Sequence, residues 1–273
     1  MNKFMVDKDL CIKCGMCVKD CPSSVIEMNE YPVLEKKGCL KCGHCLTVCP
    51  TGAISILGYT PEESTLLEGS FPSAQQMKML IKGRRSVRQY HDKDVDPNTI
   101  KELLDIASHA PTGANMRAVQ FIVIDNKKTM DAFRNDVYAE LATVLPKEIP
   151  KGDHVLELLS LAVKDRAENG SDIIFRGAPH LVITIAPKAT ACPVADTHIA
   201  LAYFELMAQA MELGTVWSGI FLWVLARIPD ITTRLGIPED HLIGYAMAFG
   251  LPVVKYQRTV ERGSANIKSV SWR

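Results

Sequence analysis

The residues best suited to chemistry are the cysteines, since eight of the nine lie within the first 49 residues. Four of them follow the spacing CxxCxxCxxxCP, and the same spacing recurs 28 residues later. A glycine follows the second cysteine of each run, and the tails PSSVI and PTGAI match, so the segment is an internal repeat. Disulfides are typical of small exported proteins, and no export signal precedes these cysteines, so the pattern favours metal ligation.

The spacing is that of a site for two iron-sulfur cubes, in which the last cysteine of each run binds the other cube. The ligands expected for the first cluster are Cys11, Cys14, Cys17 and Cys49, and those for the second are Cys39, Cys42, Cys45 and Cys21. Zinc is the alternative, because CxxC pairs also bind zinc. Zinc requires neither the third cysteine nor the repeated Cys-Pro. The segment resembles bacterial dicluster ferredoxins, and it is expected to hold two 4Fe-4S clusters.

The ninth cysteine, Cys192, lies alone between Ala191 and Pro193. A lone cysteine is most often a small apolar residue in the packing. The sequence therefore predicts a structural residue here rather than a reactive thiol.

A second candidate site is the segment RRSVR, which brings three guanidiniums and a hydroxyl into five residues from Arg84 to Arg88. Arginine suits bidentate capture of phosphate, so the segment indicates an anion site, with a solvated basic turn as the alternative. The chain has no GxGxxG, Walker GxxxxGK or HExxH motif, which disfavours a Rossmann dinucleotide site, P-loop chemistry and zincin chemistry. A mononucleotide is the ligand that fits.

From about Ser73 to Arg273 the chain resembles the nitroreductase family of FMN-dependent oxidoreductases. The resemblance rests on four segments in this order, which are RRSVRQY from Arg84, ASHAPTGAN from Ala107, LGTVWSG from Leu213 and GLPVVKYQR from Gly250. It implies a homodimer with two FMN sites at its interface. It also implies flavin-centred chemistry, in which no side chain acts as a catalytic nucleophile.

The resemblance also implies which residues contact FMN. Those expected to hold its phosphate, ribityl chain and pyrimidine edge are Arg84, Ser86, Arg88 and Arg258, with Arg85 as an accessory. Those expected to line the flavin of the other subunit are Pro111, Thr112 and Asn115. The backbone of Trp217, Ser218 and Gly219 is expected to face the N5 side of the flavin. Arg117 stands near a position where many family members carry glutamine, and we expect it to bring positive charge to the flavin or to an anionic substrate.

The elements that position these residues follow from hydrophobic periodicity and turn signals. The stretch from Gly58 to Ser73 is rich in turn formers, which predicts a ferredoxin-like domain over 1–58, a linker over 59–72 and an FMN-binding domain over 73–273. Helices are expected over 74–83, 97–110, 129–145, 154–169 and 196–213, and strands over 119–124, 181–186 and 243–249. The first helix should carry Met77, Leu80 and Ile81 on one face. This mixture predicts an α+β fold with a central sheet flanked by helices.

The helix expected over 196–213 is apolar on nearly every side, which predicts burial between the subunits of a homodimer. The alternative is a central helix of a monomer. The composition adds little about partners, because 31 Lys and Arg balance 31 Asp and Glu and 23% of residues are charged. That balance argues against a nucleic-acid partner. No apolar stretch is long enough for a membrane span, so we expect a cytoplasmic protein.

Together these features predict an enzyme that receives electrons through two 4Fe-4S clusters and reduces a small conjugated electrophile, such as a nitroaromatic or a quinone, at FMN. Reduced ferredoxin or NAD(P)H is the expected donor. Two alternatives are an electron-transfer adaptor that serves a partner protein and a flavoenzyme resembling a reductive dehalogenase.

Overall fold

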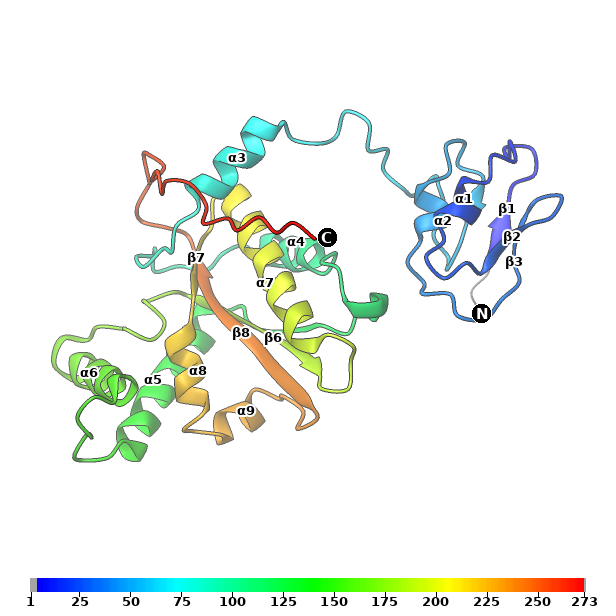
Figure 1. The fold of residues 1–273 in the computed structure, drawn as a ribbon. Coiled ribbons are helices and arrows are strands. Elements are labelled where there is room, and N and C mark those ends of the chain that lie inside the picture. The colour runs from blue at the N-terminus through cyan, green and yellow to red at the C-terminus, as the bar shows by residue number, and fades with distance from the viewer. Residues whose placement is uncertain (1–3, 273) are drawn as a thin grey trace. The chain divides into compact units, whose positions relative to one another are not determined.

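The computed structural model describes residues 4–272, and the chain divides into two compact units (Figure 1). The first unit contains the residues up to Pro72 together with Thr112–Arg117, and the second contains Ser73–Pro111 and the residues from Ala118 onward. Residues 62–72 form no helix or strand and are all exposed. They fall within the segment that the composition indicates as a linker.

The first unit is built from two small antiparallel strand pairs and two short helices. Strand β1 (Met5–Val6) pairs with β4 (Ile54–Ser55), and β2 (Ile26–Met28) pairs with β3 (Pro32–Leu34). The helices are α1 (Met16–Lys19) and α2 (His44–Thr47). The core of this unit is small, and its buried members are Cys17, Val25, Ile26, Cys45, Leu46, Ile54 and Ile56.

The 28-residue sequence repeat is also a repeat of backbone conformation. Gly15 and Gly43 both have φ 74° and cap the amino ends of α1 and α2. Lys13 and Lys41, two residues earlier, are left-handed as well, with φ 58° and 55°. A glycine adopts this conformation without steric cost, which explains why one follows the second cysteine of each run.

The second unit has a four-stranded antiparallel sheet in the order β5-β6-β8-β7. Its strands are β5 (Gln120–Ile124), β6 (His180–Pro187), β8 (His241–Gly250) and β7 (Gly214–Trp217). The first three were predicted to within two residues at each end. Strand β7 was not, because four residues at a sheet edge carry too little periodicity to reveal a strand.

Alternate residues of the central strands face two different hydrophobic cores. On β6, Leu181 and Ile183 belong to one core and Val182 to the other; on β8, Ala248 and Met247 separate in the same way. This is the period of two expected of a sheet buried on both faces. Helices α4 (Pro97–Ala107) and α7 (Pro193–Ala210) cover one face, and α5 (Lys127–Val144), α6 (His154–Asn169) and α8 (Gly219–Leu225) cover the other (Figure 1). The predicted α+β layered fold is confirmed.

The long helices were found where they were predicted, but the ends of α4 and α7 differ from the predicted bounds by three residues. Helix α7 begins at Pro193 rather than at Asp196, because proline is well suited to the first helical position. Cys192 caps it and is exposed, so the expectation that this cysteine is packed was wrong. Helix α4 ends at Ala107, three residues before its predicted end. Two short helices, η1 (Gly113–Asn115) and α9 (Asp230–Arg234), and α8 were not predicted.

Helix α3 (Ala74–Gly83) has the predicted bounds, and Ser73 and Gln76 form a capping box at its start. Met77 and Ile81, two of the three residues expected on one face of this helix, are exposed. Their exposed fractions are 40% and 54%.

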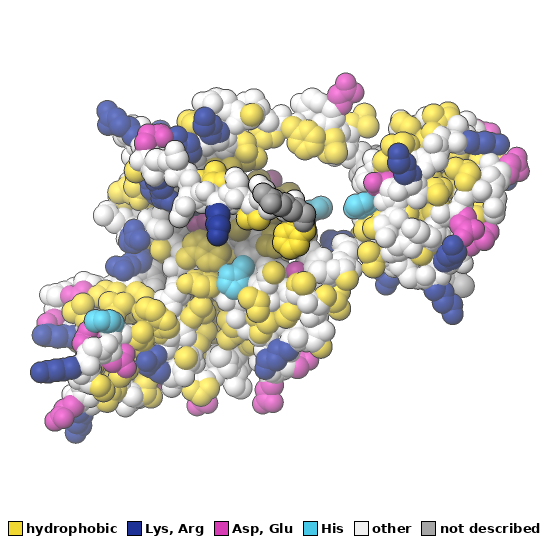
Figure 2. All heavy atoms as spheres, viewed as in Figure 1, with side chains coloured by type: hydrophobic (Ala, Val, Ile, Leu, Met, Phe, Trp, Pro, Cys, Tyr) yellow, Lys and Arg dark blue, Asp and Glu magenta, His cyan; other side chains and the backbone are white. Residues whose placement is uncertain are grey.

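Surface composition agrees with the balanced charge of the sequence. On the face shown in Figure 2, side chains of both signs are interspersed, and neither sign forms a continuous field. Within residues 4–272 no helix combines the length and the hydropathy that a bilayer crossing requires.

Candidate functional site

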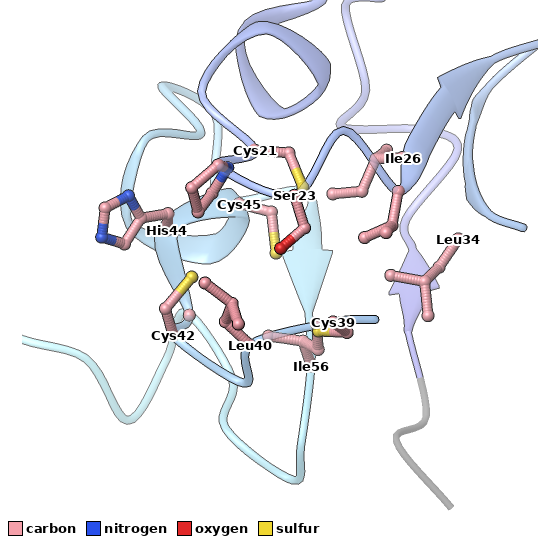
Figure 3. Close-up of a pocket in the computed structure, with 13 residues that line it drawn as sticks. Cys21, Ser23, Ile26, Leu34, Cys39, Leu40, Cys42, His44, Cys45 and Ile56 are labelled. Atoms are coloured by element: carbon pink, nitrogen blue, oxygen red, sulfur yellow. The ribbon is translucent and has the colours of Figure 1, made fainter. Parts of the chain in front are cut away.

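The eight cysteines of the first unit surround two cavities, four to each. One cavity is lined by Cys21, Cys39, Cys42 and Cys45 (Figure 3). The other is lined by Cys11, Cys14, Cys17 and Cys49. Each set combines three cysteines of one run with the last cysteine of the other, which is the grouping that the spacing predicts.

The local fold explains this exchange between the two runs. Cys17 and Cys45 lie inside α1 and α2, while Cys21 and Cys49 lie just beyond the ends of these helices. One turn of helix is enough to turn the fourth cysteine away from the three before it. Among residues 4–272, no three His, Cys, Asp or Glu side chains converge as ligands of a single ion; the thiols border a space instead.

The thiols differ in how readily they ionise. Burial raises the pKa of Cys17, and it raises the pKa of Cys45 to about 11. Burial acts in the same direction on Cys49, but the Ala53 N–H, which donates to its sulfur over 3.2 Å, and the Thr51 hydroxyl outweigh it and lower the pKa. Buried thiols that resist ionisation in the apo chain become thiolates when iron supplies the positive charge. The donor set therefore fits iron-sulfur clusters.

In the second unit, the arginine-rich segment lies beside strand β7. Ser86 forms an isolated parallel bridge with Thr215, and the Val87 N–H donates to the Thr215 carbonyl over 2.8 Å. A Cβ on Gly214 would stand 2.8 Å from the Val87 side chain, so this contact requires glycine. The segment is thereby held next to the strand that ends at Trp217.

The arginines of this segment have different surroundings. Arg84 forms an ion pair with Glu205 of α7 over 3.0 Å, and Arg85 donates from Nη1 to the carbonyls of Lys82 and Arg84. The Nη2 of Arg85 is buried without a partner. A buried guanidinium N–H is costly unless an acceptor reaches it, so this atom fits an anionic cofactor that supplies one.

Arg88 lines a cavity of about 340 Å³ together with Trp217, Ser218 and Gly219. Its aromatic wall includes Tyr245, whose ring meets that of Trp217 edge-on at 5.1 Å between centroids. A Cβ on Gly219 would lie 2.6 Å from the Tyr245 hydroxyl, so glycine is required for this close approach. The cavity combines a cation with flat aromatic walls, which are features that bind a planar polar ring.

The remaining candidate residues lie elsewhere. Pro111 is the last residue of its segment in the second unit, and Thr112, Asn115 and Arg117 belong to the first. Asn115 donates from Nδ2 to the carbonyls of Leu40 and Lys41 over 2.9 and 3.0 Å, and the Thr112 hydroxyl accepts the Arg117 N–H. Arg258 is exposed in the segment after β8. None of these residues lines the 340 Å³ cavity.

Residues 81–251 match the model of the Nitroreductase family, more than half of the chain, and residues 10–56 match that of a 4Fe-4S dicluster domain. The chain belongs to the nitroreductase family. A relative from Methanothermobacter thermautotrophicus, named for NADH dehydrogenase and NAD(P)H nitroreductase activity, is 28% identical over 171 residues, which are 61% of this chain and 72% of the relative. The resemblance inferred from the sequence motifs is confirmed.

Two solved structures extend the likeness to the fold of this nitroreductase-family chain. A Bacteroides fragilis nitroreductase with bound FMN covers 71% of this chain and 99% of its own, at 21% identity and a TM-score of 0.55. Iodotyrosine deiodinase, bound to FMN and 3-iodo-L-tyrosine, covers 72% of this chain and 100% of its own, at 17% identity and a TM-score of 0.51.

The predicted site residues include four of the residues that line the cavity of this nitroreductase-family chain, and among those that sequence reasoning missed are Arg176, Trp223 and Tyr245. Tyr245 lies inside β8 and looks like any other strand aromatic. Arg176 carried one signal, because it precedes a glycine between a predicted helix and a predicted strand, where a left-handed turn is common.

Proposed function

We propose that this chain, an FMN-dependent oxidoreductase with two 4Fe-4S clusters, takes up electrons through the clusters and uses them at the flavin to reduce a small conjugated electrophile. A cluster carries one electron at a time, whereas a flavin accepts single electrons and delivers them in pairs. The observation that carries the proposal is that one chain holds two four-thiol cavities and an aromatic cavity bearing an arginine. Nitroaromatics and quinones are the substrate classes that such a flavin site favours.

In this proposal the side chains bind and orient, and none acts as a nucleophile. Arg85 offers its unpaired Nη2 to the phosphate end of FMN, and Arg88 reaches the flavin from the wall of the cavity. The backbone at Trp217, Ser218 and Gly219 faces the reactive edge of the ring. The likeness to FMN-bound nitroreductases supports these roles.

We propose further that the protein is a homodimer. Helix α3 leaves Met77, Met79 and Ile81 exposed, and Tyr203 on α7 is 42% exposed. Apolar residues gathered on one helix favour burial against a second copy. In such a dimer Pro111, Thr112 and Asn115 would line the flavin of the other subunit.

The decisive experiment follows flavin and cluster absorbance in the anaerobic stopped-flow after mixing with reduced ferredoxin, NADH or NADPH in turn. In the wild type, reduced ferredoxin should bleach the clusters before the flavin. Cys42→Ser should retain FMN but slow flavin reduction by ferredoxin, because it removes a cluster ligand. Cys192→Ser, which changes an exposed cysteine far from the repeat in sequence, is the matched control. Equal rates in Cys42→Ser and the control would contradict the proposed electron path.

Reductive dehalogenation is a second candidate, favoured by the shared fold with iodotyrosine deiodinase. Release of halide from a halophenol under reducing conditions would support it. Neither halide release nor reduction of a nitroaromatic, from a protein loaded with all its cofactors, would leave the role of an electron-transfer adaptor instead.

A further inference from the structure

Arg176 adopts a backbone conformation that few arginines adopt. Its φ is 61°, and Gly177, the next residue, has φ 70°, so two successive residues are left-handed. In a residue with a side chain this conformation is strained, and such strain is often found where a side chain must point to a functional position. The turn lies between α6 and β6.

A buried carboxylate holds the turn in place. Asp172 accepts the backbone N–H of Phe175 through Oδ1 and that of Gly177 through Oδ2, both over 2.9 Å. The same carboxylate is bound by Arg134 over 2.8 Å and by the Tyr138 hydroxyl over 3.0 Å. Because both neighbours of Arg176 are tied to one carboxylate, the backbone on each side of Arg176 is held in place.

The Arg176 side chain lines the 340 Å³ cavity. Arg88 is the other charged residue there, and the lining includes no aspartate or glutamate. None of the ion pairs among residues 4–272 includes Arg176. An arginine whose backbone is held in place and whose guanidinium has no ion-pair partner, in a cavity walled by Trp217, Trp223 and Tyr245, matches a flat ligand with an anionic end.

We infer that Arg176 binds the carboxylate of a planar aromatic acid, and that the substrates are therefore aromatic carboxylates rather than neutral aromatics. This inference rests on the proposed function and refines its substrate class. The proposed function assigns cations of the segment from Arg84 to Arg88 to the phosphate and ring of FMN, which leaves Arg176 as an additional cation in the cavity that Arg88 lines. Its guanidinium can bind both oxygens of a carboxylate.

The test uses the oxidised full-length protein with its cofactors and measures the binding of benzoate and of benzamide, its neutral analogue. Both dissociation constants are obtained from equilibrium dialysis and from the change in flavin absorbance. Arg176→Gly is the principal variant, since glycine adopts φ 61° without strain and the turn is kept. Arg176→Lys keeps the charge without the forked geometry, and Arg234→Gln removes an exposed arginine outside the cavity as a control.

The wild type should bind benzoate more tightly than benzamide. Arg176→Gly should weaken benzoate binding by roughly tenfold to a hundredfold and leave the benzamide constant close to that of the wild type. Arg176→Lys should restore part of the difference. Equal losses for the two ligands, or no preference in the wild type, would overturn the inference.

Loss of FMN from Arg176→Gly would also overturn the inference, because Arg176 would then hold the cofactor. Failure of the proposed function would look different. The purified wild type would lack flavin or iron in its spectrum before any ligand is added.

Discussion

In the second unit, the buried carboxylate of Asp172 forms an ion pair with the buried guanidinium of Arg134, and this pair should contribute to the stability of the fold. The side chain of Asp172 is 6% exposed and that of Arg134 is 8% exposed. Asp172→Ala would remove the buried carboxylate that pairs with the Arg134 guanidinium and would free two backbone N–H groups. We expect a loss of about 3–5 kcal/mol in the free energy of unfolding, measured by urea denaturation. Asp105→Ala, at the exposed ion pair with Lys101, should change it by less than about 0.5 kcal/mol.

His180 predicts a pH dependence at the same scale. Its Nε2 accepts the Val95 N–H over 2.9 Å, and burial lowers its pKa below the ordinary value, although Asp94 opposes the shift. As the pH falls below about 6.5, His180 binds a proton in the unfolded chain but stays neutral in the folded chain. The free energy of unfolding therefore decreases as the pH falls. His180→Gln, whose amide oxygen can accept the same bond, should flatten this slope. The comparison is of unfolding midpoints between neutral and mildly acidic pH; an unchanged slope would contradict it. His154→Gln, at an exposed histidine, should retain the slope.

At the scale of elements, the sequence predicted what depends on periodicity and missed what depends on contacts. Helix α6 was located to the residue, since Asp153 caps its start and Gly170 ends it. Strand β7 and the turn at Arg176 were missed, because β7 is defined by pairing with β8 and the turn by the distant contacts of Asp172. The grouping of cysteines could be predicted because one short helical turn separates each fourth cysteine from its run. The position of Arg176 in the lining of the 340 Å³ cavity could not be predicted from the sequence.

Gly214 tests how β7 positions the arginine segment. Gly214→Ala would place a Cβ 2.8 Å from Val87 and push that segment from the strand. We expect a loss of about 1–3 kcal/mol in unfolding free energy and a lower FMN content after purification. Gly83→Ala is the matched control, since nothing lies within 4 Å of its Cβ position. In the last turn of α3 it should stabilise the protein slightly. Full FMN content in Gly214→Ala would show that the segment does not depend on this contact.

At the scale of the whole molecule, the chain leaves the second unit at Thr112, joins the first unit for six residues, and returns at Ala118. Within residues 112–117 the backbone of Ala114, Asn115 and Arg117 is left-handed, with φ between 50° and 52°. Such a run is strained and persists only where contacts hold it. The contacts that hold it include the two bonds from Asn115 to Leu40 and Lys41, in the loop between Cys39 and Cys42. The conformation of residues 112–117 therefore depends on the loop from Cys39 to Cys42, which lines a four-thiol cavity.

Asn115→Gly tests this dependence without disturbing the backbone, because glycine adopts φ 52° freely. Loss of two hydrogen bonds to backbone carbonyls should favour local opening by about 1–2 kcal/mol, or roughly fivefold to thirtyfold. Hydrogen exchange measured by mass spectrometry should accelerate in peptides covering 39–42 and 112–117 together, while α5 and α6 keep their rates. Ala114→Gly removes only a methyl group at another left-handed position and should leave both peptides unchanged. Faster exchange at 112–117 alone would mean that the cysteine loop holds its conformation without Asn115.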